Sequence, residues 1–259
     1  MNSHTVNGLH FYTFEALDRY GVPHAIFTRR GGVSPHPWAS LNLGGSVGDA
    51  IERVRENKRR ALDAINLSVY STHDVWQVHS AEVVCVDKPK EPDQPYQKAD
   101  AILTDQKGVT LFMRFADCVP ILLFDKNKGV SGIAHAGWQG TLLGIAEKAV
   151  QKMMETYGSK PEDIWAGIGP SICSYHYPVG VEVWRQAVET MPFVVEKSFV
   201  FERGQYRFDL WLANQLILEQ VGVRDIEVSG LCTACNLADW YSHRAENGKT
   251  GRFGVAISL

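Results

Sequence analysis

Apolar residues recur along the chain with two spacings. Four segments place them on every third or fourth position, as on one face of an α-helix: 50–65, 140–157, 179–190 and 210–221. Between them lie shorter runs rich in Val, Ile, Leu and Phe, which predict strands at 24–28, 75–86, 109–115, 121–124, 130–134, 164–168, 226–229 and 253–258. Several strands follow one another without a helix, so we predict the α+β class, with a mixed β-sheet core flanked by helices.

The intervening segments predict the domain organisation. The segment 125–129, Asp-Lys-Asn-Lys-Gly, predicts a hairpin turn, and 88–100, with three prolines among polar residues, predicts a loop. Residues 1–20 read as an N-terminal extension of strand and loop. The length fits one large domain or two tightly packed halves, and we find no internal repeat.

Composition narrows the class of partner. Lys and Arg number 26 against 29 Asp and Glu, a net charge of -3, which argues against nucleic acid or an anionic membrane surface. The N-terminus lacks the basic and apolar regions of a secretory signal, and no apolar run approaches the roughly 20 residues of a membrane span. We therefore expect a cytoplasmic protein that binds small molecules and keeps its five cysteines reduced.

Three short strings each place one good metal ligand beside a strand-like run. They are Trp76-Gln77-Val78-His79-Ser80, Phe115-Ala116-Asp117-Cys118-Val119-Pro120 and Gly132-Ile133-Ala134-His135-Ala136-Gly137-Trp138. A single His or Cys at a strand end is usually a core residue, but strand ends can converge. Two imidazoles and a thiolate suit Zn²⁺ and leave a fourth position free for catalysis. We therefore hypothesise a metal site of His79, Cys118 and His135.

A set of ordered motifs carries a resemblance that covers nearly the whole chain. The motifs are Phe27-Thr28-Arg29-Arg30-Gly31-Gly32-Val33-Ser34, Ser40-Leu41-Asn42-Leu43-Gly44, the three strings above, Gly167-Ile168-Gly169-Pro170, Cys232-Thr233, Ser242-His243-Arg244 and Thr250-Gly251-Arg252. In this order they resemble the signature of the YfiH or laccase-domain family.

The resemblance implies a single α+β domain over 1–259, distantly related to the cytotoxic necrotizing factor deamidase fold. It also implies zinc on His79, Cys118 and His135 beside a purine-nucleoside site. Family members are described as phosphorylases of adenosine, inosine, guanosine and methylthioadenosine, as adenosine deaminases, as polyphenol oxidases and as peptidoglycan editing factors.

Physical chemistry ranks these activities. Multicopper oxidation needs roughly ten histidines, commonly paired as His-x-His. This chain has nine histidines and no such pair, so laccase chemistry is the weakest interpretation, with copper only an adventitious occupant of the zinc site.

Deamination and phosphorolysis make different demands. Deamination needs a water activated at the metal and a proton carrier, for which Asp117 is the nearest carboxylate, unless it only bonds backbone. Phosphorolysis needs donors that hold phosphate, and we predict Arg29 first and the start of the helix after His135 second. Gln139 stands where many members of the resembled family carry a basic residue, so one phosphate contact is absent there.

Other candidate residues have weaker signals. We place Asn42, Gln139 and Cys173 among the candidate substrate-binding residues, although a turn asparagine often bonds its own backbone and a buried thiol is often inert. Cys232-Thr233-Ala234-Cys235 looks like half of a zinc ribbon with no second Cys pair, so we interpret it as structural. Arg244 and Arg252 are predicted to brace a hairpin.

The sequence leaves a choice of function. The leading hypothesis is a zinc-dependent purine nucleoside phosphorylase and adenosine deaminase that takes nucleoside and phosphate, as a monomer or homodimer. The first alternative makes Cys118 the nucleophile of a cysteine hydrolase, with His79 or His135 as its base, as an editing factor for a peptidoglycan precursor would need. The second is a binding module that holds zinc without turnover.

Overall fold

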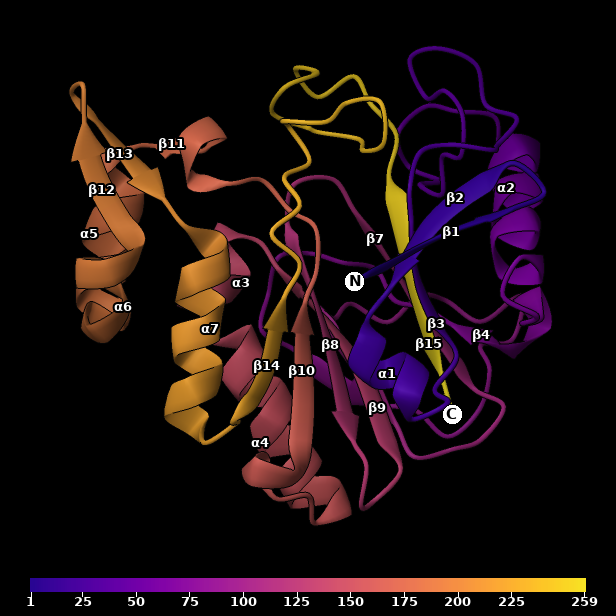
Figure 1. Cartoon of the computed structure of the whole chain (residues 1–259), viewed down its shortest axis with the longest axis horizontal. Helices are drawn as coiled ribbons and strands as arrows, with labels where there is room; N and C mark the ends of the chain where they lie inside the picture. The colour runs from indigo at the N-terminus through magenta and orange to yellow at the C-terminus, as the bar shows by residue number, and fades with distance from the viewer.

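The strands that are apolar at every position are buried on both faces, and this sets the layers of the fold. The computed structural model describes residues 1–259 and places most strands in two six-stranded sheets (Figure 1). The first sheet has the order β1 (Asn2–Val6), β2 (Leu9–Thr13), β3 (His24–Phe27), β15 (Phe253–Ser258), β7 (Thr110–Phe115) and β4 (Thr72–His73). The second has the order β14 (Asp225–Val228), β10 (Ile164–Ile168), β8 (Val119–Asp125), β9 (Val130–Ala136), β6 (Ala101–Thr104) and β5 (Val83–Cys85).

Both sheets are mixed. Most neighbours are antiparallel, but β4 runs parallel to β7, β5 to β6, and β14 to β10. The α+β prediction is confirmed, with two large sheets where the sequence predicted one sheet core.

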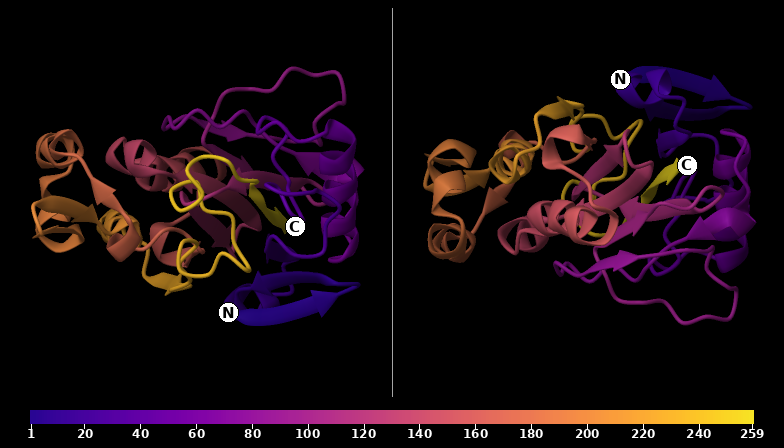
Figure 2. Two further views of the ribbon diagram at one scale, coloured as in Figure 1. Left: turned by 90° about the horizontal axis from the view of Figure 1, so that it is seen from above. Right: turned by 90° about the horizontal axis from the view of Figure 1, so that it is seen from below.

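Alternating side chains fill three layers of core. Along β7, Leu111 and Met113 point between the two sheets, whereas Phe112 points to the outer face covered by α2 (Ile51–Asp63). Along β8, Leu122 lies between the sheets, whereas Leu123 packs on the helical side. The outer face of the second sheet is covered by α4 (Ile145–Tyr157) and α7 (Leu210–Val221). Figure 2 shows α2 on one side of the two sheets and these two helices on the other.

A small lobe stands at one end of the molecule, at the left of Figure 1. It contains α5 (Val181–Thr190), α6 (Pro192–Ser198) and the three-stranded sheet β11 (Pro178–Val179), β13 (Gln205–Phe208) and β12 (Phe199–Glu202). The remaining elements are short: α1 (Glu15–Arg19), α3 (Trp138–Leu142), η1 (Val69–Ser71), η2 (Pro161–Asp163) and η3 (Ser174–His176). None of the helices combines the length and the apolar character that a membrane crossing requires.

The helix predictions are confirmed at α2, α5 and α7 to within two residues at either end. The single helix predicted over 140–157 is wrong, because Gly144 takes a left-handed φ of 77° and separates α3 from α4. The 75–86 strand is also wrong, since only β5 forms there and residues 77–82 are irregular. Residues 88–100 carry no regular element beyond a bridge from Lys98 to Trp76, and residues 1–20 form the β1–β2 hairpin and α1.

Candidate functional site

The three predicted ligands meet where the chain crosses from one sheet to the other. Cys118 lies in the connection from β7 of the first sheet to β8 of the second. Pro120 of β8 pairs with His135 of β9, so Cys118 lies beside that histidine at the same end of the hairpin. His79 comes from the irregular segment between β4 and β5. The prediction that the three residues converge is confirmed, although His79 does not lie at a strand end.

The three ligand atoms are close enough to share one metal ion. All lie within 4.8 Å of one another, and His79 Nε2 is 3.8 Å from Cys118 Sγ. Three atoms so placed have a shared point within about 2.8 Å of each, near zinc–ligand distances of about 2.0–2.3 Å. His135 is buried, Cys118 half-buried and His79 exposed, so the group opens toward solvent on one side.

Asp100 holds two of these ligands from behind. Its fully buried carboxylate accepts a hydrogen bond from His135 Nδ1 at 2.8 Å, which leaves Nε2 of that ring free for a metal. The same carboxylate accepts the backbone N–H groups of Val78, His79 and Ser80 at 2.6–3.2 Å. The sequence analysis did not identify Asp100, although a lone carboxylate directly before an apolar run was an available signal.

These hydrogen bonds explain why 75–86 does not form one strand. His79 has a left-handed φ of 60°, which costs about 1–3 kcal/mol and persists only where surrounding contacts impose it. The three N–H groups that bind Asp100 turn inward instead of pairing with a neighbouring strand. Residues 78–80 therefore do not pair with a strand, and their bonds to Asp100 hold His79 in position.

Electrostatics favour an ionised thiol in this group. Burial opposes the charge on Cys118, but the adjacent His135 and His79 rings lower its pKa to about 6. Burial likewise opposes the charge on His135, but Cys118 and Asp100 raise its pKa to about 9. Although burial favours its neutral form, hydrogen bonds from His135 and Ser80 lower the pKa of Asp100 to about 2. The thiol thus has the low pKa that both a metal ligand and a nucleophile require.

A glycine allows the close approach of the thiol. A Cβ on Gly137 would lie 2.9 Å from Cys118 Sγ and 3.2 Å from His79 Cδ2, closer than side-chain contacts normally allow. Gly137 is thus a position at which only glycine leaves the ligands undisturbed.

The open side of the three ligands faces a cavity of about 750 Å³. This volume falls in the range of small-molecule sites, about 300–1,000 Å³. Four aromatic side chains line it: Trp76, Tyr96, Trp138 and Tyr177. Such faces are suited to stacking on a planar base.

Arg114, Arg244 and Arg252 supply positive charge to the same cavity. Arg114 is paired with Asp74 at 3.0 Å. Arg244 and Arg252 have no carboxylate within 4.0 Å and bond only backbone carbonyls, those of Pro178 and Gly251 among them. Burial lowers the pKa of Arg252, with Cys118 and Asp117 opposing. Both guanidinium groups bond backbone carbonyls, as bracing residues would, but neither meets the acidic partner that the sequence prediction assumed, so both also present uncompensated charge to the cavity.

Arg29 has the bracing role instead. Its guanidinium pairs with Glu246 at 3.1 Å, donates to Ala39 O at 2.8 Å and stacks on the Tyr241 ring at 4.3 Å. It is absent from the cavity lining, which argues against the predicted phosphate contact. Its donors are used to join three segments of the chain.

Asn42 is fully buried and also lies outside the cavity lining. Its Oδ1 accepts the backbone N–H of Arg252 at 2.9 Å, and its Nδ2 donates to Asp49 at 3.0 Å. The predicted substrate contact becomes a positioning contact for the segment that carries Arg252.

The remaining predicted residues divide between the cavity and its wall. Asp117 and Gln139 line the cavity, but the Asp117 carboxylate already accepts from Thr233 Oγ1 at 2.6 Å and from the Arg244 backbone N–H at 2.7 Å. Cys173 does not line it and belongs to a second cluster. The helix after His135 is only five residues long, so it is not the long helix proposed as a phosphate site.

Comparison with known proteins gives consistent results over the chain. Residues 23–259 match the family described as "Multi-copper polyphenol oxidoreductase laccase". A purine nucleoside phosphorylase of Deinococcus radiodurans is 40% identical over 240 residues, which cover 92% of this chain and 89% of the relative. The purine nucleoside phosphorylase YlmD of Bacillus subtilis is 38% identical over 241 residues, which cover 90% of this chain and 86% of the relative.

Solved structures give the same result for the fold. The Bacillus licheniformis protein YfiH superposes with a TM-score of 0.90 at 33% identity, covering 99% of this chain and 98% of that one. YlmD of Geobacillus stearothermophilus also has a TM-score of 0.90, at 34% identity, covering 98% of this chain and 97% of that one.

Proposed function

The chain belongs to the laccase-domain family that includes YfiH and YlmD, and we propose that it is a zinc-dependent purine nucleoside phosphorylase. Relatives that carry the name purine nucleoside phosphorylase support an enzyme that acts on nucleosides. The observation that carries the reaction class is the cavity itself. Its lining contains three residues that could hold a metal together with Arg244 and Arg252, two guanidinium groups without carboxylate partners.

Zinc fits His79, Cys118 and His135 by donor chemistry. One thiolate and two imidazoles are borderline-soft ligands, and the bond from His135 Nδ1 to Asp100 fixes the ring as in other metal sites with a histidine–carboxylate pair. A zinc ion held there would supply Lewis-acid polarisation at its open position. Copper is accommodated by the same donors, but multicopper chemistry is not, because the two clusters together contain only three histidines.

The cavity residues divide the work of phosphorolysis. Arg244 and Arg252 would bind phosphate by charge-assisted hydrogen bonds and direct an oxygen at the ribose anomeric carbon. A C1′–O bond forms, the C1′–N9 bond breaks, and the leaving purine takes up the proton that the attacking hydrogen phosphate gives up. Trp76 and Tyr177 can hold the base by stacking, and the products are the free purine and ribose 1-phosphate.

Product analysis tests this proposal. Purified protein is incubated with inosine or adenosine, with and without inorganic phosphate, and products are separated by liquid chromatography. We expect hypoxanthine or adenine with an equal amount of ribose 1-phosphate, only when phosphate is present. Free base in the absence of phosphate, or no base at all, would contradict the proposal.

We propose adenosine deamination as a second reaction in the same cavity. A metal held by His79, Cys118 and His135 would have an open position on the cavity side, where it could activate water. In the same assay the product would be inosine with release of ammonia, independent of phosphate. Arg244→Gln should therefore weaken phosphorolysis far more than deamination.

The low pKa of Cys118, about 6, also fits the alternative of a thiolate nucleophile in a hydrolase that edits a peptidoglycan precursor. Metal content separates the two. Stoichiometric zinc that disappears in Cys118→Ala, together with activity lost to chelators, supports the metalloenzyme. Full amidase activity in metal-free protein would support the hydrolase.

A further inference from the structure

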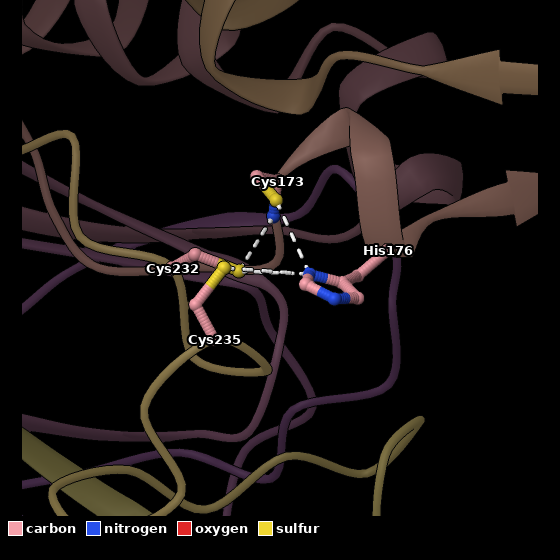
Figure 3. A group of neighbouring side chains, drawn as sticks. All are labelled: Cys173, His176, Cys232 and Cys235. Carbon is pink, nitrogen blue, oxygen red and sulfur yellow. Dashed lines mark hydrogen bonds between the residues drawn. The ribbon is translucent and has the colours of Figure 1, made fainter.

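A second group of metal-ligating side chains lies beside the cavity wall and is not used by the proposed reaction. Cys173 directly precedes η3, His176 is the last residue of η3, and Cys232 and Cys235 lie at a turn after β14. Figure 3 shows the four side chains pointing toward one another from these two segments. The spacings, Cys-x₂-His and Cys-x₂-Cys, are those with which structural zinc sites collect ligands in pairs.

The distances match one tetrahedral ion. His176 Nδ1 lies 3.5 Å from Cys173 Sγ, 3.7 Å from Cys232 Sγ and 3.5 Å from Cys235 Sγ. Zinc–sulfur bonds of about 2.3 Å and zinc–nitrogen bonds of about 2.0 Å place tetrahedral ligands about 3.5 Å apart. All four ligand atoms lie within 4.8 Å of one another, which is compact enough for a single ion.

The backbone around the cluster is built to hold the two segments together. Ser171 forms a parallel bridge with Cys232, and the Ser171 N–H donates to Leu231 O at 3.2 Å. The Cys173 N–H donates to Cys232 Sγ at 3.3 Å. The cluster therefore joins segments that the backbone already aligns.

We propose that Cys173, His176, Cys232 and Cys235 form a second, structural Zn²⁺ site. Three thiolates and one imidazole fill a zinc tetrahedron, which is the ligand set of closed structural sites and leaves no position for substrate. A disulfide would use only two of the four converging groups. The Cys232–Cys235 pair, half of a zinc ribbon in the sequence, is completed by a Cys-His pair from a distant segment.

This site would fasten the cavity wall to the small lobe. Thr233, between the two cysteines of the turn, donates to the Asp117 carboxylate next to Cys118. Tyr177, directly after His176, lines the cavity, and the following Pro178 carbonyl accepts from Arg244. One closed metal site would thus fix the positions of groups on three sides of the open one.

Zinc stoichiometry tests the proposal without any assay of activity. Protein purified under reducing conditions without chelators is analysed by mass spectrometry for zinc per chain. We expect about two zinc ions in the unaltered protein, about one in Cys235→Ser, about one in Cys118→Ser and about none when the two substitutions are combined. The matched control is Cys85→Ser, an exposed thiol outside both clusters, which should keep both ions.

Cobalt gives an independent measurement of the ligand set. Co²⁺ loaded into Cys118→Ser should show thiolate-to-metal charge transfer about three times as intense as Co²⁺ loaded into Cys235→Ser, since the clusters hold three thiolates and one. The site is refuted if Cys235→Ser retains the zinc content of the unaltered protein. An iron–sulfur absorption spectrum, or a Cys232–Cys235 disulfide in reduced protein, would also refute it. Failure of the phosphorolysis assay leaves these results unaffected.

Discussion

The two Cys/His clusters use the same ligand types but differ in how many donors the fold brings to one point. His79, Cys118 and His135 provide three donors and face a cavity of about 750 Å³. Cys173, His176, Cys232 and Cys235 provide four and line no part of that cavity. A catalytic zinc has three protein ligands and an open fourth position for substrate or water, whereas a structural zinc has four protein ligands. The number of donors therefore separates the two roles.

The same distinction applies to the arginines. Arg29 uses its donors on Glu246 and backbone carbonyls inside the protein, whereas Arg244 keeps its charge unpaired at the cavity. A metal site can act on a substrate only if one coordination position is free. In the same way, a guanidinium can bind a substrate only if it has charge and donors that no other protein group uses.

The largest expected effect comes from removing one ligand of the open cluster. Cys118→Ala should lower kcat/KM for phosphorolysis by roughly 10³-fold, beyond the 10–100-fold typical of an outer partner of a metal ligand. Cys235→Ser should change kcat/KM far less, because no group of its cluster touches the cavity. Steady-state kinetics on both variants, with folding checked by circular dichroism, make the measurement. An equal loss of kcat/KM in the two variants would contradict the assignment of different roles to the two clusters.

A smaller effect is expected from the carboxylate behind the open cluster. Asp100→Asn keeps the shape but weakens the bond to His135 Nδ1, so metal affinity should fall by about 10–100-fold. Competition with a chromophoric chelator measures the affinity, and zinc added in excess should restore part of the activity. The metal of the other cluster should be retained, and its loss would show that Asp100 acts on the fold as a whole.

The arginines provide a third test. Arg244→Gln should raise the KM for phosphate by about tenfold or more and leave the melting temperature nearly unchanged. Arg29→Gln should leave the phosphate KM unchanged and destabilise the fold by roughly 1–3 kcal/mol, because the hydrogen bonds of a half-buried guanidinium to Glu246 and Ala39 are lost. Initial rates against phosphate concentration, with thermal unfolding, separate these outcomes. A raised phosphate KM in Arg29→Gln would return that residue to the substrate site.

The smallest effect should be on stability during partial chelation. Metal at the open cluster is reached from the cavity, so a chelator should remove one ion and the activity first, with little change in melting temperature. Removal of the second ion should then lower the melting temperature further. Zinc release followed together with activity and unfolding gives the order. Loss of both ions in a single phase would contradict the open and closed assignment.

The fold was largely predictable because its main signals are local. Helix α7 begins and ends where the apolar period does, and β10 and β15 match the predicted runs. The wrong prediction of the 75–86 strand arises where contacts between residues far apart in sequence override the local pattern. Within the predicted strand 75–86, Asp100, 20 or more residues away in sequence, binds the N–H groups of Val78, His79 and Ser80 and so removes them from strand pairing.

The sequence by itself determined which residues can bind a metal, because the donor chemistry of His79, Cys118 and His135 belongs to the side chains themselves. The tertiary structure alone decided how that capacity is used. It placed Cys173 and His176 against Cys232 and Cys235, paired Arg29 with Glu246 and left Arg244 unpaired at the cavity. The physical reason is that donor type is a property of one residue, whereas partnership depends on segments far apart in the chain being brought to hydrogen-bond distance.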